Sequence, residues 1–595
     1  MRVLLAVCAG LLWSPIYSRS TAVRPDAFIE HVRYLASPEL GGRGSGTEGL
    51  EKAAQYLEGQ FKSFGVQPAG TNGYFQPFSI TKSARPGQNN RLSATDARSA
   101  KFREDFIPLS FSSSGDAKGP VVFAGYGITS KTHKYDDYEG LDVKGKIVIV
   151  LRYEPAYFHR DFKQPTHHAH LVSKAINARD RGAKALILVN GFPEKKVSDD
   201  LIRFGSVSGP ERSDILFLQV KNGVADGWFK SSGKTVEGLQ KQIESTGKPA
   251  SFALPESFEV AARVDILREK ATVRNVVAFV PGRSPEYVVI GAHYDHLGLG
   301  DENSLAPSQI GSVHPGADDN ASGTAGLLEL ARYFGSRGGP LDRGVLFIAF
   351  AAEEIGLLGS GEWVKHPTKP LNDAIAMINM DMIGRIKNSK LYIGGTGTSS
   401  AFAPIFKEIA PDYDFKVDYS QDGYSASDHT SFVAKNIPAL FFFSGLHADY
   451  HKPSDTWNKI DSREGALVVN LVADVTDRLI AAKDRPDFVK VESVALHGGA
   501  APGGGGGYGP YFGSIPDFAQ EENGVKFSDV RAGSPAAKAG LKADDVLVRF
   551  GDKPIKNLYD FTFALRNSKV GDVVPVVVMR DGKELKVDVK LEARQ

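Results

Sequence analysis

Histidine and carboxylate side chains gather in the second half of this chain, at the ends of short apolar runs. His293 and Asp295 follow one such run, and the adjacent pair Glu353 and Glu354 follows another. Imidazole together with carboxylate is zinc-ligand chemistry, and more carboxylates than one tetrahedral ion can hold point to two ions. The runs and the polar residues after them are 287–291 with His293 and Asp295, 344–350 with Glu353 and Glu354, 374–380 with Asp381, and 438–443 with Tyr450 and His451.

The apolar runs are the elements that must position these side chains. A further acidic stretch, 316–320, lies between the first two runs and contains Asp318, and a helical pattern from 321 to 334 follows it. Short apolar runs that alternate with helices are typical of buried parallel strands. In open α/β sheets ligands bind beyond the carboxyl ends of the strands, which is where these polar residues fall. The sequence therefore predicts an α/β fold with a metal site at one edge of its sheet.

Taken in order, these motifs resemble those of the co-catalytic di-zinc aminopeptidases. The order is His-x-Asp at 293–295, Asp-Asp-Asn-x-Ser-Gly at 318–323, Glu-Glu at 353–354, a single Asp381, and Tyr-His at 450–451. That family includes secreted bacterial leucine aminopeptidases, aminopeptidase Y and glutamate carboxypeptidase, and the similarity covers about 23–110 and 256–485. The resemblance implies a mixed, largely parallel sheet that is sandwiched by helices.

The resemblance also implies a role for each matching residue. Asp318 corresponds to the carboxylate that bridges two zinc ions, and the peptide bond after the bridging residue is cis in the resembled enzymes. Glu353 corresponds to the general base, and Asp295 is the natural partner for the second nitrogen of His293. The expected ligands of two Zn²⁺ ions are His293 and Asp381 on one ion, Glu354 and His451 on the other, and Asp318 between them.

Two tyrosines are candidates to stabilise the oxyanion of a tetrahedral intermediate. Tyr450 precedes His451, as in some members of the resembled family, and Tyr424 lies in a stretch that matches a pocket tyrosine in others. Asp428 belongs to that same stretch and is expected in the substrate pocket, whereas His429 is expected in the pocket wall. Simple packing remains the alternative for both tyrosines, and Tyr450 is the preferred candidate.

The rest of the chain predicts accessory domains around a catalytic domain in two parts, 23–114 and 257–485. Residues 115–256 resemble a protease-associated α/β domain, and its histidines 167, 168 and 170 are more typical of a loop than of a metal site. A Gly-rich linker at 486–507 leads to 508–595, which resembles a β-rich PDZ domain that binds the carboxyl end of a peptide. We expect a PDZ domain on such a linker to swing, although packing against the catalytic domain is an equal alternative.

Composition and the first residues limit the location and the partners. A charged Arg2 followed by an apolar stretch to Trp13 predicts an export signal at 1–22, so the protein is expected to be secreted or periplasmic. No later apolar run is long enough for a membrane span. The net charge of +1 gives no reason to expect nucleic acid as a partner. The single cysteine, Cys8, lies in this leader, so no disulfide is expected.

These observations predict an enzyme that hydrolyses the N-terminal peptide bond of peptide substrates, with a zinc-activated water and Glu353 as base. A carboxypeptidase or dipeptidase of the glutamate carboxypeptidase type is the close alternative. A non-catalytic peptide-binding protein on the same scaffold is a more distant one, because the relatives of that kind have lost metal ligands that this chain keeps.

Overall fold

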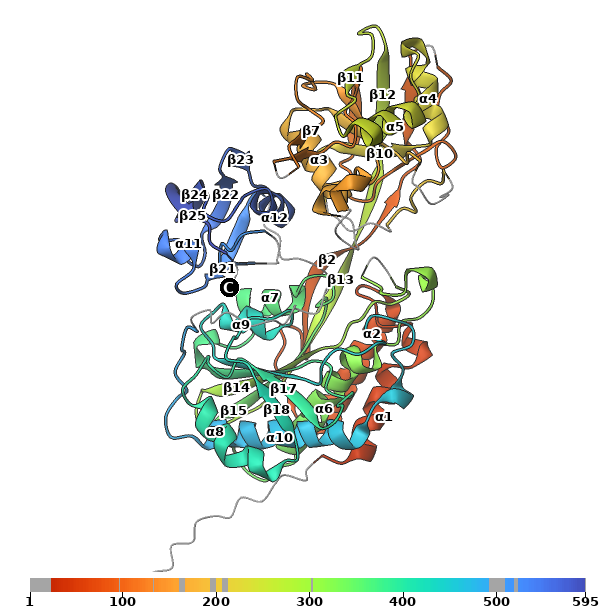
Figure 1. Ribbon diagram of the computed structural model, residues 1–595. Coiled ribbons are helices and arrows are strands. Elements are labelled where there is room, and N and C mark those ends of the chain that lie inside the picture. The colour runs from red at the N-terminus through yellow and green to blue at the C-terminus, as the bar shows by residue number, and fades with distance from the viewer. Residues whose placement is uncertain are drawn as a thin grey trace, which may run out of the picture.

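The computed structural model describes residues 23–95, 97–131, 133–159, 166–192, 199–205, 212–300, 303–491, 509–517 and 523–593. It contains a main domain (23–86 and 266–491), an insert (87–265) and a C-terminal domain (509–593). In Figure 1 the two parts of the main domain are red to orange and green to light blue, the insert is orange to yellow-green, and the C-terminal domain is dark blue. The predicted leader at 1–22 and most of the predicted linker at 486–507 lie outside the described residues.

One mixed sheet forms the centre of the main domain. Its strands are β1 (Gln67–Pro68), β2 (Phe75–Pro86), β13 (Ile266–Val280), β14 (Tyr287–His293), β15 (Gly344–Phe350), β16 (Ala374–Met380), β17 (Lys390–Gly394), β18 (Lys416–Tyr419) and β19 (Ala439–Phe443). Their order is β1-β13-β15-β14-β16-β19-β17-β18, with β2 beside β13. The strands β15, β14, β16 and β19 at the centre are parallel to one another. They are the four apolar runs from which the sequence predicts buried strands.

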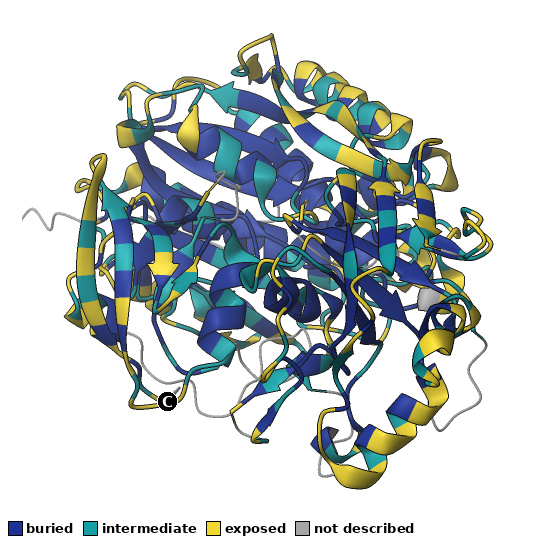
Figure 2. Ribbon diagram, turned by 90° about the horizontal axis from the view of Figure 1, so that it is seen from above, coloured by how far each residue is buried: buried dark blue, intermediate teal, exposed yellow. Residues whose placement is uncertain are grey.

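Helices cover both faces of this sheet. On one face, α1 (Pro25–Leu35), α2 (Glu48–Ser63), α6 (Gly323–Gly335), α8 (Phe402–Ile409) and α10 (Ser462–Ala481) share a core with Val288, Ile290 and Ala292 of β14. On the other face, α7 (Leu358–Lys365) and α9 (His429–Val433) pack Trp363 and Phe432 against Val289. Successive strand residues point to opposite faces, so a strand that is apolar throughout needs both layers. Figure 2 shows the buried strands between helices that are exposed on their outer sides.

The helix α2 illustrates why the sequence forms these elements where it does. Ala53, Leu57 and Phe61 recur every four residues and are buried, which gives the helix one apolar face. The side chain of Thr47 accepts a hydrogen bond from the backbone N–H of Leu50 and so caps the first turn. Gly65, with φ of 71°, follows the helix at the point where a left-handed residue commonly ends one.

The insert stands away from the main domain on the long antiparallel pair of β2 and β13 (Figure 1). Its strands are β3 (Arg91–Ala94), β4 (Phe106–Pro108), β5 (Gly115–Phe123), β8 (Ile147–Leu151), β9 (Ala185–Val189), β10 (Leu216–Val220), β11 (Phe252–Ala253) and β12 (Glu259–Val264), with β6 (Thr129–Ser130) and β7 (Tyr135–Asp136) in a small second sheet. Its helices are α3 (Leu171–Asp180), α4 (Asn222–Phe229) and α5 (Val236–Thr246).

The insert is larger than the predicted range 115–256. The main sheet of the insert runs β3-β12-β5-β8-β9-β10-β4, so three of its strands lie outside that range. Leu92, Phe106 and Val260 from these strands are buried in the core of the insert. The range predicted for the first part of the catalytic domain, 23–114, therefore ends too late, because β3 and β4 pair with strands of the insert.

The C-terminal domain has a core of its own and lies between the other two units (Figure 1). Its sheet contains β20 (Ser514–Pro516), β21 (Val525–Val530), β22 (Val546–Phe550), β23 (Lys553–Pro554), β24 (Val573–Arg580) and β25 (Lys583–Lys590), with the helices α11 (Pro535–Lys538) and α12 (Leu558–Arg566). Ion pairs link it to the insert through Arg179 and Asp560 and to the main domain through Arg531 and Asp422. The domain is thus docked, which is the packing alternative that the sequence left open.

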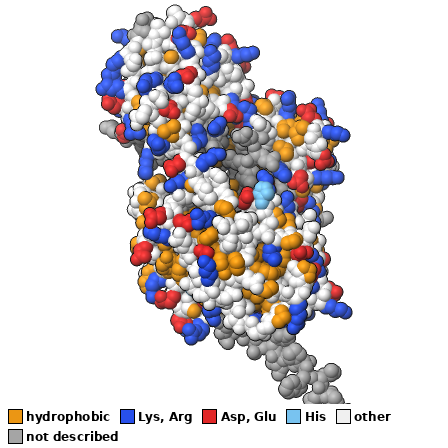
Figure 3. All heavy atoms as spheres, turned by 180° about the vertical axis from the view of Figure 1, so that it is seen from behind, with side chains coloured by type: hydrophobic (Ala, Val, Ile, Leu, Met, Phe, Trp, Pro, Cys, Tyr) orange, Lys and Arg blue, Asp and Glu red, His pale blue; other side chains and the backbone are white. Residues whose placement is uncertain are grey.

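The surface shows mixed charge. On the face drawn in Figure 3, basic and acidic side chains are interspersed over all three units, which fits the net charge of +1. Within the ranges that the structure describes, each helix is either too short or too polar to cross a bilayer.

Candidate metal centre

The carboxyl ends of the central strands bring the predicted side chains together. His293 is the last residue of β14, Asp381 directly follows β16, and Glu353 and Glu354 follow β15 after two alanines. His451 comes from the chain that leaves β19. Because the strands are parallel, all of these positions meet at one edge of the sheet, as the sequence predicts.

The first group surrounds the imidazole of His293. Its Nε2 lies 3.3 Å from Asp381 Oδ1 and 3.4 Å from Asp319 Oδ1. Ser427 Oγ donates a hydrogen bond of 2.8 Å to the other oxygen of Asp381, which fixes the orientation of that carboxylate. One oxygen of Asp381 therefore faces His293 and the other is held by the protein.

The second group surrounds the imidazole of His451. Its Nε2 lies 3.1 Å from Glu354 Oε2 and 3.2 Å from Asp319 Oδ2. Its Nδ1 lies 2.9 Å from the carbonyl oxygen of Asn303, a contact that orients the ring. The two oxygens of Asp319 thus belong to different groups, and this carboxylate lies between them.

The structure places Asp319 between the groups rather than Asp318, for which the sequence predicts that role. Asp318 Oδ1 accepts hydrogen bonds from the backbone N–H of Gly384 at 2.7 Å and from Ser322 Oγ at 3.0 Å, and its Oδ2 lies 3.2 Å from His447 Nε2. The backbone at Asp319 is not helical (φ −103°, ψ 95°), so the two adjacent side chains point in different directions. The cis peptide bond follows Asp319 and not Asp318.

His296 joins the second group, and the sequence analysis did not single it out. Its Nδ1 lies 2.6 Å from Glu354 Oε1 and 3.7 Å from Asp319 Oδ2, and the residue is 2% exposed. The available signal was its position three residues after His293 at the same strand end. His296, Asp319 and Glu354 form one set of close potential ligands, and His293, Glu353 and Asp381 form another.

The separations within each group fit zinc. Ligand atoms about 2.0–2.1 Å from a tetrahedral ion are about 3.3 Å from one another. The four nitrogen–oxygen distances around His293 and His451 are 3.3, 3.4, 3.1 and 3.2 Å. The donor set of imidazole and carboxylate is also that of zinc. The described side chains of each group therefore fit zinc, and Asp319 contributes one oxygen to each group.

The electrostatics of the site call for cations. Burial raises the pKa of the Glu353 carboxyl well above its ordinary value, and the nearby carboxylates of Asp428 and Asp381 add to the effect, whereas His293 opposes it. Burial raises the pKa of Asp381 as well. Like charges this close are unfavourable in a buried site unless positive ions lie among them.

Glu353 is held beside the first group by Asp295. Asp295 Oδ1 accepts a hydrogen bond of 3.1 Å from the backbone N–H of Glu353, and its Oδ2 accepts one of 2.8 Å from Ser45 Oγ. The same Oδ1 lies 3.7 Å from His293 Nδ1. The nearest contact of the ring Nδ1 is the backbone carbonyl oxygen of Asp295, at 3.3 Å, while the Asp295 carboxylate holds the segment that carries Glu353. Glu353 Oε2 lies 3.9 Å from His293 Nε2.

Three non-glycine residues next to the site have a left-handed backbone conformation, each on a different segment. They are Ala352 (φ 60°), Met382 (φ 55°) and His451 (φ 54°). Such a conformation is uncommon for residues with a Cβ and persists where the surrounding structure enforces it. Here it turns the backbone sharply next to Glu353, Asp381 and His451, which aims their side chains at a common region.

Arg43 holds several backbone segments near the site together through hydrogen bonds. Its guanidinium is fully buried and donates to the carbonyl oxygens of Tyr294 at 2.8 Å, Pro315 at 2.8 Å and Gly316 at 2.9 Å, and also to that of Leu35. Burial lowers its pKa to about 10, against the attraction of nearby carboxylates led by Asp295. The loop that contains Arg43 thus ties the segment after β14 to the segment before Asp319.

The remaining predicted residues occupy different environments. The ring of Tyr450 stacks on His451 with 3.9 Å between centroids, and the carboxylates of the centre raise the pKa of its hydroxyl further than burial alone. Tyr424 instead donates a 2.7 Å hydrogen bond to Asp529 of the C-terminal domain, so its hydroxyl lies at a domain interface. Asp428 is fully buried. His429 is buried against Phe441.

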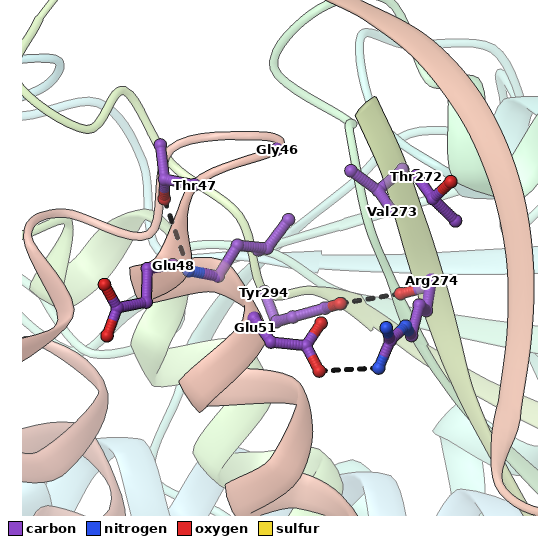
Figure 4. A pocket seen from close by; sticks show the side chains of 9 residues that line it. Gly46, Thr47, Glu48, Glu51, Thr272, Val273, Arg274 and Tyr294 are labelled. Carbon is purple, nitrogen blue, oxygen red and sulfur yellow. Dashed lines mark hydrogen bonds and ion pairs between the residues drawn. The ribbon is translucent and has the colours of Figure 1, made fainter. Parts of the chain in front are cut away.

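A separate pocket lies on the far side of Tyr294 (Figure 4). It has a volume of about 240 Å³ and is lined by residues of α2, β13 and the segment before α2. Tyr294 donates to the carbonyl oxygen of Arg274, whose guanidinium pairs with Glu51 at 2.5 Å. None of the cluster residues lines this pocket. Its polar groups are already paired with one another, so it adds no ligand to the centre.

Comparison with protein families identifies three regions of the chain. Residues 275–476 match the model of peptidase family M28, which spans the segment from β13 to α10. Residues 117–226 match the PA domain and residues 516–591 match the PDZ domain. The three matches fall in the main domain, the insert and the C-terminal domain respectively.

Similar proteins include aminopeptidases from bacteria and fungi. Aminopeptidase YwaD of Bacillus subtilis is 28% identical over 365 residues, which are 60% of this chain and 67% of that protein. A probable leucine aminopeptidase of Arthroderma otae is 31% identical over 209 residues, 34% of this chain and 56% of that protein. The chain thus spans between about half and two thirds of the length of these curated relatives.

Solved structures of similar architecture include BSAP, a zinc aminopeptidase from Bacillus subtilis. It is 24% identical to this chain, the match covers 79% of this chain and 99% of that one, and the TM-score is 0.47.

Proposed function

The chain contains a domain of peptidase family M28, and on that premise we propose that it is a metal-dependent aminopeptidase with two zinc ions. The observation that carries the proposal is the position of Asp319, whose two oxygens lie 3.4 Å from His293 and 3.2 Å from His451. His293 and Asp381 would hold one ion, Glu354 and His451 the other, and Asp319 both. His296, 2.6 Å from Glu354, would orient that ligand. The names of the similar proteins support a peptide as substrate.

Zinc ions at these two points would polarise the carbonyl of the scissile bond and activate water as the nucleophile. Glu353 takes a proton from the attacking water as the new C–O bond forms. It returns that proton to the nitrogen of the leaving group as the C–N bond breaks. Asp295 holds Glu353 in place through the backbone N–H of Glu353. Tyr450, next to His451, is positioned to donate a hydrogen bond to the oxyanion.

The C-terminal domain and the leader extend the proposal. A PDZ domain adds an extended peptide to a sheet edge, and β20 is the edge strand of this sheet, so a peptide carboxyl end is the ligand we propose for it. Export through the apolar stretch after Arg2 would place the enzyme in the periplasm or outside the cell. N-terminal sequencing of the protein recovered from those fractions tests the second point.

A substrate panel tests the activity. Aminoacyl-nitroanilides and N-blocked peptides are incubated with the zinc-loaded protein, with and without a chelator. The proposal predicts release of nitroaniline from free-amine substrates, loss of that activity with chelator, and recovery when zinc is restored. Cleavage confined to N-blocked substrates would instead indicate the carboxypeptidase type, and activity that survives complete removal of metal would contradict the proposed mechanism.

A further inference from the structure

One short segment of the main domain touches both the metal centre and the C-terminal domain. This segment, which we term the 422–428 loop, precedes α9 and lies beside the end of β16 through Ser427. Its first half carries Asp422 and Tyr424, and its second half carries Ser427 and Asp428. The two halves make their contacts with different parts of the molecule.

The first half is bound by the C-terminal domain. Tyr424 Oη donates to Asp529 Oδ2 at 2.7 Å, and Arg531 Nη1 lies 2.6 Å from Asp422 Oδ2. The guanidinium of Arg531 also lies over the ring of Tyr424, 5.5 Å from its centroid. Asp529 is 4% exposed and additionally pairs with Lys490, so its carboxylate is shared between two groups of the main domain.

The second half is bound to the metal centre. Ser427 Oγ accepts a 2.8 Å hydrogen bond from Asn379 Nδ2 and donates a 2.8 Å bond to Asp381 Oδ2. Because Asn379 supplies the donor to this hydroxyl, the proton of Ser427 is directed to Asp381. The other oxygen of Asp381 is left to face His293. Only two residues separate Tyr424 from Ser427, so a displacement of Tyr424 is transmitted to the partner of Asp381.

We propose that Asp529 of the C-terminal domain is a positioning residue for the metal ligand Asp381, acting through Tyr424 and Ser427. The inference rests on the proposed zinc site and adds a residue from outside the M28 domain to it. It makes the docked domain part of the support of the active centre.

The test uses the full-length zinc-loaded protein and the variants Tyr424→Phe and Asp529→Asn. Tyr424→Phe removes the 2.7 Å hydrogen bond, and Asp529→Asn weakens it because a neutral amide replaces the charged acceptor; both keep the size of the side chain. Substitution of a residue that hydrogen-bonds a metal ligand typically lowers metal affinity or activity by about 10- to 100-fold. For a residue that acts through another one we expect about tenfold. Each variant should bind the zinc ion between His293 and Asp381 about tenfold more weakly. It should also lower kcat on a short nitroanilide about tenfold and leave KM unchanged.

Three further variants distinguish positioning from a general loss of structure. The double variant should be at most about twofold worse than Tyr424→Phe alone, because both substitutions act on the same interaction. Asp529→Glu should restore part of the zinc affinity. Arg179→Met removes one of the ion pairs between the C-terminal domain and the insert and should leave zinc affinity and kcat unchanged. A cobalt-substituted sample reports the geometry of the point directly, and its absorption spectrum should change in Tyr424→Phe but not in Arg179→Met.

Several results would overturn the inference. Zinc affinity and spectrum within twofold of the wild type in both single variants would do so, as would strictly additive effects in the double variant. An equal loss in Arg179→Met would also count against it, because docking in general would then be responsible. If the wild-type protein binds zinc but cleaves no peptide substrate, the proposed function fails, whereas the zinc-affinity comparison still decides the inference.

Discussion

Two pairs of adjacent acidic residues carry the proposed chemistry, and within each pair the side chains have different surroundings. Glu354 faces His451 and His296, whereas Glu353 lies beside His293 and is held by Asp295. Asp319 lies between the two metal groups, whereas Asp318 is bonded to Gly384 and Ser322. Neighbouring side chains on non-helical backbone point apart, so each pair can divide the work of binding metal and supporting it.

Glu353→Gln tests the role of the base. The amide keeps the size of the side chain but cannot accept the proton, so kcat should fall by at least about 100-fold, the contribution of a positioned general base. Both zinc ions should remain bound, because the described distances place His293, Asp381 and Asp319 around the first ion without it. Atomic absorption of the dialysed protein measures the metal. Near-normal turnover in this variant would assign the proton transfer to another group.

Asp319→Asn and Asp318→Asn form a matched pair of neighbouring substitutions. Asp319→Asn removes charge from both groups, so the protein should lose zinc and the rate should fall by more than about 100-fold, beyond the usual effect of an outer partner. Asp318→Asn should keep both ions and lose about tenfold at most. Zinc content and kcat are measured for both. The reverse pattern would restore Asp318 as the shared ligand.

The sequence could predict which residue types meet at the strand ends but not which member of the Asp-Asp pair is shared. Asp318 and Asp319 have the same chemistry and adjacent positions, and the choice depends on the φ and ψ of Asp319. His296 was missed because only the folded strand end brings it to Glu354. The contact of Tyr424 with Asp529 could not be predicted, because the two residues lie more than a hundred positions apart in different domains.

At the scale of elements, one buried cation joins loops that the sheet alone does not hold. Arg43 donates to carbonyl oxygens on three segments, which belong to the end of α1, to the residue after His293 and to the stretch before Asp319. The guanidinium has enough donors in a fixed fork to serve several acceptors at once, which an ammonium group does not. These contacts give the Gly-Arg-Gly stretch at 42–44 a structural role.

Arg43→Met should destabilise the main domain by at least about 3 kcal/mol. The substitution leaves several buried carbonyl oxygens without donors, and each such group costs about 1–3 kcal/mol. Arg43→Lys keeps the charge and should recover only part of the loss. The free energy of unfolding in urea gives both values, and zinc retention should fall in the same order. A stability of Arg43→Met equal to that of the wild type would mean that water or backbone shifts satisfy these carbonyls.

The histidines of the insert predict acid sensitivity rather than metal binding. Burial lowers the pKa of His168 to about 3 and that of His167 to about 4, and Phe158 packs edge-on against the His168 ring. In the unfolded chain His168 has its ordinary pKa of 6.5. Between about pH 3 and pH 6.5 the unfolded chain therefore binds more protons than the folded one. The stability contributed by neutral His168 is complete above about pH 6.5 and is lost as the pH falls toward 3.

His168→Phe should therefore flatten the acid side of the stability curve of the insert. The apolar ring occupies the same site without an unfavourable protonation, so the melting temperature should change less between pH 7 and pH 4.5 than in the wild type. Calorimetry measures this difference. His366→Gln, at an exposed histidine of the main domain, serves as the control and should behave as the wild type. Identical curves for His168→Phe and the wild type would show that other groups set the acid limit.

Sequence periodicity predicted the central strands more accurately than it predicted the domain borders. The apolar runs became β14, β15, β16 and β19 because a strand covered on both faces has no polar side. The insert begins earlier than predicted because β3 and β4 are short and carry no long apolar run. Strand pairing across distant segments, such as β12 with β3, decided where the insert ends.

At the scale of the whole molecule, the C-terminal domain connects two units that, within the described residues, are otherwise joined by the β2–β13 ribbon (Figure 1). Arg179 pairs with Asp560 at 2.9 Å, Lys553 with Asp180 at 2.9 Å and Lys556 with Asp214 at 2.9 Å, and all three pairs cross to the insert. The side chains of Arg179 and Asp560 are 10% and 2% exposed, so salt screens this pair far less than the exposed pair of Lys556. The sequence could not predict this docking, because a Gly-rich linker is equally compatible with a free domain and a bound one.

Arg179→Met should release the insert from the C-terminal domain and let it move on its ribbon. The substitution leaves the buried carboxylate of Asp560 without its guanidinium, and an unpaired buried charge disfavours the docked arrangement. Small-angle X-ray scattering should show a larger radius of gyration than in the wild type. The radius of gyration of the wild type should stay constant when sodium chloride is raised to about 1 M. Salt at this concentration screens exposed ion pairs strongly and the buried Arg179–Asp560 pair much less. Lys556→Ala, which removes only the exposed pair, is the matched control and should leave the scattering unchanged at low salt. Expansion of the wild type at high salt would mean that the exposed pairs hold the domains together, and an unchanged Arg179→Met would mean that the ribbon alone fixes the insert.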